Sequence, residues 1–395
     1  MSSKGGCTMQ ARHEFGKALW QKTMRPRLLQ DAEWGLNSIL DWLEWTQSSD
    51  IASDVFKRLY GEGPYANAPV RIGNDTYSIT PRNLVGLPAG FTKDGRGLLA
   101  LDAAGFGSIE IGTLVPAPQP GNLKPRFFVE YRETEDLLIS VNRFGFNCEE
   151  GVEGAVQRVQ KIWRERGEDA IKATLIWSFG PNKATMERYE ETRDLRLIAI
   201  DIAYALLRMM PVLRRKDAIS FNVASPNTPG LRFLFERFGE LLELIMDNVG
   251  AVARISSKPV PPCIITLSPD MSDEQMRHVA IATAQHRQVI ALRAFNTTID
   301  EKIRAAYGIQ EIGGVSGDPL EELTYTKLKV LNHILQEESL EIDVIAVGGI
   351  TQPQLAVDRL SIALGKRVKA VQVLSGLFKD GFSLVSEIQE AVAKT

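Results

Sequence analysis

Short apolar runs rich in β-branched residues recur along the chain from residue 84 onward. Each run is followed by glycine or polar residues and then by a longer stretch with helical periodicity, which is typical of repeated βα units. Because the runs are almost continuously apolar, we expect strands that are buried on both faces. The eight runs lie at 84–90, 108–114, 173–180, 218–225, 262–268, 288–295, 343–349 and 370–376. This pattern predicts an α/β fold, a (β/α)8 TIM barrel in residues 61–395.

The interval between the second and third runs is too long for a single helix. Connections of this length without structure of their own are uncommon in compact domains, and many of them are functional. We therefore expect a functional insertion at about residues 115–160.

Residues 1–60 differ from the rest of the chain and predict an N-terminal helical segment. Leu36, Ile39, Leu40 and Leu43 recur at i, i+3, i+4 and i+7, which places one apolar stripe on a helix. Phe15, Leu19 and Trp20 indicate another helix before it, and Pro26 separates the two.

Two interpretations of this segment stay open. The helices could form a hairpin packed on the barrel, as most amphipathic helices do. They could also lie in a membrane interface, since four of the six tryptophans fall in the first 45 residues, close to several cations. The residues concerned are Trp20, Trp34, Trp42, Trp45, Lys17, Lys22, Arg25 and Arg27.

The composition favours a small molecule as the partner of this protein. Lys and Arg total 46 against 49 Asp and Glu, so no basic surface for broad nucleic-acid binding is expected. Cys7, Cys148 and Cys263 lie far apart, which disfavours a metal site or a disulfide framework and favours a reducing, cytoplasmic compartment. Neither a spanning apolar run nor a signal sequence is recognisable.

In a barrel of this kind, chemistry belongs at the carboxyl ends of the strands. The residues expected there are mostly neutral amides and hydroxyls with one cation: Lys93, Thr113, Ser178, Ser225, Thr266, Asn296, Gly348, Gly349 and Ser375. This set contains no carboxylate pair, so a glycosidase is poorly supported. A Ser-His-Asp hydrolase is rejected as well, because no histidine lies in a predicted strand-end loop and Ser225 is not in a G-x-S-x-G motif.

Several asparagines converge on the same mouth. The stretch FNVASPNTPGLR supplies Asn222, Ser225, Asn227 and Thr228, NRFGFN supplies Asn142 and Asn147, and FNTT supplies Asn296 and Thr297. The first set could be no more than a turn network. Together, however, the amides suit a planar polar ligand with imide and carboxylate edges, with Lys93 holding the carboxylate.

The glycine-containing strand ends AVGGI and VLSGL fall at the seventh and eighth strands. Loops after these strands often bind phosphate, although glycine also serves ordinary turns. A phosphorylated cofactor is therefore expected.

Seven motifs, in this order and spacing, are similar to those of the class 2, quinone-linked dihydroorotate dehydrogenases. They are AGFTKDG, IEIGTLVPAPQPGN, NRFGFN, FNVASPNTPGLR, FNTT, GGVSGDPL and AVGGI, and the resemblance covers roughly residues 80–390. It implies an FMN-containing barrel that oxidises dihydroorotate to orotate in pyrimidine biosynthesis and passes the electrons to a quinone. It also implies a cytoplasmic protein that is peripheral to a membrane of the bacterial inner type, with the helical segment as the membrane contact.

The resemblance also implies roles for residues. Dihydroorotate or orotate would be bound by Lys93, Asn142, Asn222, Asn227, Asn296 and Thr297. Ser225 would be the base, with Phe146 and Thr228 shaping the proton exit. Asn222 would also contact FMN, and the remaining cofactor contacts would be Ala89, Gly90, Thr113, Ser178, Thr266, Gly317, Gly348, Gly349 and Ser375, with the last three at the phosphate.

This chain departs from the family on the flavin side. Thr266 replaces a lysine beside the flavin, Ser178 replaces an asparagine, Thr92 replaces an acidic residue and Phe295 replaces a small hydroxyl residue. The departures leave two alternatives open. One is an FMN-dependent paralogue acting on another cyclic amide or pyrimidine-like compound, and the other is a catalytically weak relative that only binds a flavin or pyrimidine.

Arg293 is unexpected within the apolar run VIALRAF, because a buried charge is costly unless it is paired. One hypothesis is that Arg293 reaches a carboxylate outside the barrel. The other is that it leans toward the fifth strand and replaces the missing lysine.

Overall fold

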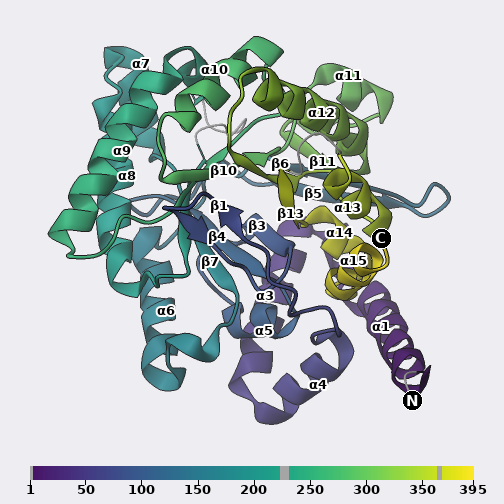
Figure 1. Cartoon of the computed structure of the whole chain (residues 1–395). Helices are drawn as coiled ribbons and strands as arrows, with labels where there is room; N and C mark the ends of the chain where they lie inside the picture. Colours follow the sequence, from purple (N-terminus) through teal and green to yellow (C-terminus); the bar gives the residue numbers. More distant parts are fainter. Residues whose placement is uncertain (1–2, 223–230, 363–366) are drawn as a thin grey trace.

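The computed structural model describes residues 3–222, 231–362 and 367–395. Within these ranges eight parallel strands form a closed barrel (Figure 1). In order around the barrel they are β3 (Val85–Thr92), β4 (Ser108–Leu114), β7 (Thr174–Phe179), β8 (Ala218–Phe221), β9 (Cys263–Thr266), β10 (Val289–Ala294), β12 (Asp343–Val347) and β13 (Val368–Gln372). Closure comes from the pairing of β13 with β3. Each of the eight predicted runs overlaps one barrel strand, so the predicted TIM barrel is confirmed.

Apolar side chains explain why these segments are strands. Every residue of β4, β7, β8, β9 and β10 is buried, as expected for strands covered on both faces. The helices that follow the strands cover the outside of the barrel: α5 (Leu98–Ala103), α6 (Gly151–Arg166), α8 (Arg196–Met209), α9 (Phe238–Ile255), α10 (Asp273–Ala284), α12 (Glu321–Glu337), α13 (Pro353–Leu360) and α15 (Ser383–Ala393).

Additional short elements decorate the barrel. They include the helices α7 (Lys183–Thr192), α11 (Glu301–Ala306) and α14 (Ser375–Asp380), and 3-10 turns at Glu168–Ala170, Met210–Val212, Leu231–Arg237 and Asp318–Leu320. The hairpin of β1 (Ile72–Gly73) and β2 (Ser78–Ile79) packs its isoleucines against the barrel interior at Ile176, Ile264 and Ile345. This hairpin therefore closes one end of the barrel.

The predicted insertion contains an antiparallel hairpin of β5 (Phe127–Arg132) and β6 (Leu137–Asn142). A third strand, β11 (Gly314–Gly317), comes from the segment after β10 and pairs with β6 to complete a small sheet. Because α6 begins at Gly151, the last ten residues of the predicted insertion belong to a barrel helix instead.

Four helices precede the barrel: α1 (Ser3–Thr23), α2 (Arg25–Gln30), α3 (Ala32–Ser48) and α4 (Asp50–Tyr60). Pro26 lies in the first turn of α2, where its missing N–H is tolerated. The predicted apolar stripe on α3 is buried. In Figure 1, α1 runs beside α15 and continues beyond the barrel to the N-terminus. Among the residues described, no helix is both long and apolar enough to cross a membrane.

Trp20 fastens α1 to the barrel. Its ring is fully buried and meets the Phe382 ring edge-on, with 5.5 Å between the ring centroids. Its indole N–H donates to the carbonyl oxygen of Phe378 at 3.2 Å. Gly381, at a φ of 72°, lets the backbone approach the indole, since a Cβ there would lie 2.8 Å from the ring. By contrast, Trp34 and Trp45 are 51% and 59% exposed.

We predict that Trp20→Ala weakens the docking of α1. Removing a buried tryptophan costs about 3–5 kcal/mol, so backbone hydrogen exchange in residues 11–23 should become much faster. Trp45→Ala is the control, because an exposed ring contributes little. Equal exchange in the two variants would contradict this account of how α1 is held.

Candidate functional site

A cavity opens at the carboxyl ends of the barrel strands. Its empty volume is about 1200 Å³ including the open mouth, which is large enough for ligands of ordinary size. It is lined by a majority of the site residues predicted from the sequence: Ala89, Gly90, Lys93, Thr113, Asn142, Phe146, Asn222, Asn296, Thr297, Gly348, Gly349 and Ser375. The structure thus brings together side chains from segments nearly 290 residues apart.

The other predicted residues do not line the cavity or lie outside the described residues. Ser178 on β7 and Thr266 on β9 are buried in the strands, and Gly317 is the last residue of β11. The positions of Ser225, Asn227 and Thr228 fall in residues 223–230, outside the ranges that the structure describes.

Lys93 provides the cation expected at the mouth. It directly follows β3, and its ammonium donates to Asn147 Oδ1 at 2.5 Å and lies 3.0 Å from the centroid of the Phe144 ring. Burial, and secondarily the nearby charge of Arg126, lower the pKa of Lys93 to about 7. Among the described residues no carboxylate forms an ion pair with this ammonium, and an anionic ligand would stabilise it.

Asn222 offers hydrogen-bonding capacity to a ligand. Its amide nitrogen donates to Thr113 Oγ1 at 2.9 Å, which fixes the orientation of the side chain. Within the described residues, its buried Oδ1 and the buried Oε1 of Gln372 accept no hydrogen bond. Buried acceptors without a partner are rare in native proteins, so both oxygens are suited to meet donors of a ligand in the cavity.

Another part of the cavity lining consists of glycine backbone and hydroxyl groups. Gly348 and Gly349 follow β12 with φ values of 93° and 68°, and a Cβ at Gly349 would lie 2.5 Å from Glu321 Cα. Ser375 Oγ lies 3.0 Å from Ser140 Oγ and 3.1 Å from Ser316 Oγ. These hydroxyls and the glycine backbone all line the cavity, and together they suit an anionic group such as a phosphate.

Arg293 is paired inside the barrel. One guanidinium nitrogen donates to Glu110 on β4, and the other donates to Thr266 Oγ1 at 2.7 Å. Glu110 is fully buried and also accepts from Ser220 Oγ at 2.6 Å and from Gln372 Nε2 at 3.3 Å. The hypothesis of a carboxylate outside the barrel is therefore wrong, because β4, which lies across the ring from β10, supplies an acid within it. The alternative, a lean toward β9, agrees with the contact to Thr266.

Only the cation of this ion pair lies at the floor of the cavity. Arg293 and Gln372 line the cavity, whereas Glu110 and Thr266 do not. Burial lowers the pKa of Arg293 to about 9. The positive end of the pair thus faces the ligand space and the negative end lies behind it.

Comparisons with known proteins agree with this geometry. The family model described as dihydroorotate dehydrogenase matches residues 74–395. The dihydroorotate dehydrogenase (quinone) of Escherichia fergusonii is 35% identical over 313 residues, covering 78% of this chain and 84% of the relative. The corresponding protein of Pectobacterium carotovorum is 34% identical over 311 residues, covering 78% and 83%. The chain belongs to the dihydroorotate dehydrogenase family.

Solved structures of this family share the fold. The Eimeria tenella dihydroorotate dehydrogenase in complex with ferulenol has a TM-score of 0.71 at 24% identity, covering 91% of this chain and 90% of that one. Its ligand-free form has a TM-score of 0.68 at 24% identity and covers 87% and 94%. The family resemblance predicted from the seven motifs is confirmed.

The structure adds residues and contacts to this dihydroorotate dehydrogenase cavity that sequence reasoning did not supply. Asn147 was visible in the NRFGFN motif, but only the structure shows its contact with Lys93. Glu110 carried a usable signal, because it and Arg293 are opposite charges in the middle of predicted buried strands. Ser140, Ser316 and Phe144 had no such signal, since their positions depend on how the small sheet packs over the barrel.

We predict a strongly non-additive response of stability at the buried ion pair. Arg293→Met should lower the free energy of unfolding by about 3–5 kcal/mol, because it leaves Glu110 as an unpaired buried acid. Adding Glu110→Met should recover part of that loss, since apolar replacement of a whole buried pair is often tolerated. Urea unfolding of the wild type, both single variants and the double variant measures this. Additive losses would show that the two charges do not stabilise each other.

Proposed function

We propose that this chain oxidises dihydroorotate to orotate with a bound FMN and passes the electrons to a quinone, as a step of pyrimidine biosynthesis. The observation that carries the proposal is the convergence of one half-buried ammonium and several amides on one cavity, in a chain that belongs to the dihydroorotate dehydrogenase family. The quinone follows from the printed names of the curated relatives.

The amide side of the cavity fits the substrate. Dihydroorotate is a cyclic imide with one carboxylate, so it needs a cation and groups that both donate and accept hydrogen bonds. Lys93 would bind the carboxylate, and the imide edge would be bound by Asn142, Asn222, Asn296 and Thr297. Asn227 is proposed as a further substrate contact only because it lies in the motif FNVASPNTPGLR, since it falls outside the described residues. Asn147, which holds the ammonium of Lys93, joins the set from the structure.

The glycine and hydroxyl side fits FMN. Gly348, Gly349 and Ser375 would hold the phosphate, with Ser140 and Ser316 completing the hydroxyl cluster. Gly90 has a φ of 110°, and a Cβ there would find only Leu374 at 3.8 Å, so the backbone leaves open space for a ring. Ala89, Thr113, Ser178, Thr266 and Gly317 remain proposed cofactor contacts. When bound, FMN supplies an acceptor for the hydride that leaves the substrate.

The residues of the chain would supply the proton chemistry and the electrostatics. Ser225 is the proposed base, and Phe146 and Thr228 would shape the path by which the proton leaves. A serine needs burial and a relay to act as a base at neutral pH. Arg293 lines the cavity floor, with Glu110 behind it. It would stabilise negative charge on the reduced flavin, in place of the family lysine that Thr266 replaces.

The helical segment of residues 1–60 is the proposed contact with the membrane and the quinone. It leaves several large apolar side chains exposed: Phe15, Leu19, Leu29, Trp34, Trp45, Ile51 and Val55. Such residues on helices suit an interfacial helix group. Leu36 of α3 also lines the cavity, so this segment reaches the site itself. We place the protein in the cytoplasm, peripheral to a membrane of the bacterial inner type.

A second candidate is an FMN-dependent oxidation of another cyclic amide or pyrimidine-like compound. Thr266 and its hydrogen bond from Arg293 favour it, because they make the flavin side of this chain different from that of its family.

An anaerobic titration tests the proposed function. We expect dihydroorotate to bleach the flavin absorbance of the purified protein, because the flavin accepts the hydride, and a soluble quinone to restore the colour. A protein that carries FMN but is not bleached by dihydroorotate would favour the second candidate.

Orotate binding should depend on pH through Lys93. The ammonium is the form that binds a carboxylate, and the pKa of Lys93 in the free protein is about 7. The orotate Kd should therefore be constant below that pH and rise by at most about tenfold per pH unit above it, over about pH 6 to 9. Lys93→Met should weaken binding and remove this rise, whereas Lys161→Met, at an exposed position on α6, should not. A pH-independent Kd in the wild type would refute the role of Lys93.

A further inference from the structure

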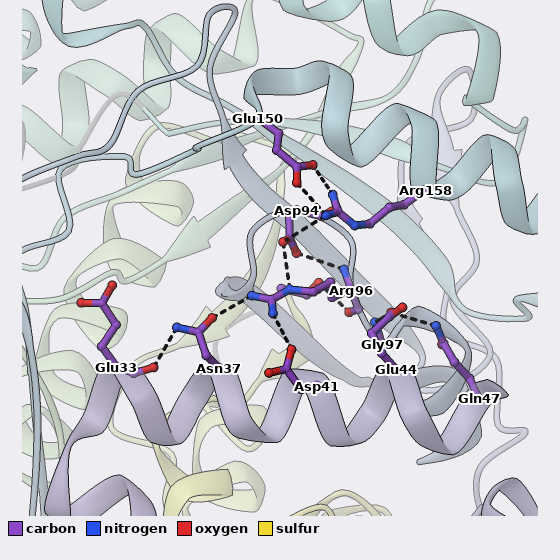
Figure 2. Close-up of polar contacts among 11 residues, drawn as sticks. Glu33, Asn37, Asp41, Glu44, Gln47, Asp94, Arg96, Gly97, Glu150 and Arg158 are labelled. Carbon is purple, nitrogen blue, oxygen red and sulfur yellow. Dashed lines mark hydrogen bonds and ion pairs between the residues drawn. The ribbon is translucent and has the colours of Figure 1, made fainter. Parts of the chain in front are cut away.

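One face of α3 carries five acceptor side chains. Glu33, Asn37, Asp41, Glu44 and Gln47 are spaced by four, four, three and three residues, which places them along one side of the helix. Figure 2 shows most of them reaching the segment that follows β3. This polar stripe runs beside the buried apolar stripe of α3, and its contacts are with the barrel rather than with solvent alone.

Arg96 joins this stripe to the loop that begins at Lys93. Its guanidinium donates to Asp41 Oδ1 at 3.0 Å and to Asn37 Oδ1 at 2.8 Å on α3 (Figure 2). The same side chain donates to Asp94 Oδ2 at 2.9 Å within the loop. One arginine therefore connects two turns of α3 to the residue next to Lys93.

Further contacts fix the same loop. Glu44 accepts from the backbone N–H of Gly97, and Gln47 Oε1 accepts from Leu99 N at 3.2 Å. On the other side, Arg158 of α6 lies 3.9 Å from Asp94 and pairs with Glu150 at 2.6 Å. The loop after β3 is thus held between α3 and α6.

Glu33 holds the second wall of the site. Its carboxylate accepts from Arg126 Nη2 at 2.9 Å and from Arg126 Nε at 3.2 Å, and Arg126 is only 3% exposed. Arg126 also donates to the carbonyl oxygens of Pro120 and Asn122 in the insertion. Its guanidinium lies 5.6 Å from the centroid of the Phe144 ring, which Lys93 contacts as well.

We propose that α3 is a positioning element of the ligand site. Through Arg96 and Arg126 it fastens the two segments that carry Lys93 and the Asn142–Asn147 motif. Docking of α3 and binding of an anionic ligand at Lys93 are therefore coupled, and each stabilises the other by the same factor. This inference rests on the proposed function, because it takes the ligand to be an anion held by Lys93.

The charges around Lys93 allow a test that separates positioning from mere stabilisation. Burial and Arg126 lower the pKa of Lys93, whereas Glu33 on α3, Cys148 in the insertion and Asp94 in the loop raise it. Glu33→Gln keeps the shape of the side chain but no longer offsets the charge of Arg126. The pKa of Lys93 should then fall further, so the pH above which orotate binding weakens should fall as well.

The experiment titrates orotate into the FMN-loaded full-length protein across the pH range. Glu33→Gln should shift the pH at which binding weakens downward, whereas Asp54→Asn, the same charge change at an exposed position on α4, should leave it unchanged. Asn37→Ala combined with Asp41→Ala should raise the orotate Kd by about tenfold, a coupling of ordinary size, with FMN content retained. Orotate should also slow hydrogen exchange in residues 33–47 of the wild type.

The outcomes distinguish the two proposals. If Lys93→Met weakens orotate binding but the α3 variants match the wild type in Kd, pH midpoint and exchange, the positioning role is overturned and the proposed function stands. If Lys93→Met has no effect either, the assignment of Lys93 to the ligand fails. If the α3 variants lose FMN together with orotate affinity, α3 acts on the fold in general and the specific coupling is wrong.

Discussion

Closure of the parallel ladder is the constraint on which this structure depends. Eight parallel strands in a ring direct all of their carboxyl ends to the same side, so the residues that follow them meet at one mouth although they are spread from Lys93 to Ser375. Closure also buries the charges inside the ring, since Arg293 and Glu110 are almost completely shielded from water. Arg293 can occupy β10 only because β4 supplies Glu110 to pair with it.

The electrostatics of the cavity follow from this arrangement of charges. Among the residues that the structure describes, Lys93, Arg126 and Arg293 lie on or close to the cavity wall. Two of them form an ion pair with a carboxylate: Arg126 with Glu33 and Arg293 with Glu110. Lys93 instead contacts an amide and an aromatic ring, and its pKa is lowered to about 7. Among the described residues, Lys93 is thus the one of these three cations without an ion pair to a carboxylate, and an anionic ligand would stabilise it.

Local sequence patterns predicted the elements but not the contacts between them. Apolar periodicity reports burial, so the eight strands and the α3 stripe were found. The family motifs located most of the cavity wall. The partner of Arg293 and the contact of Asn147 with Lys93 could not be predicted, because both depend on which side chains face one another after closure.

The two stripes of α3 have different physical tasks. Burial of Leu36, Ile39, Leu40 and Leu43 attracts the helix to the barrel, but apolar contact is not directional and would tolerate a shift along the groove. Hydrogen bonds lose strength steeply with distance and angle, so the acceptors that meet Arg96 and Arg126 select one register. Since those two arginines belong to the walls that carry Lys93 and Asn147, the register of a helix outside the barrel sets the geometry of groups inside its mouth.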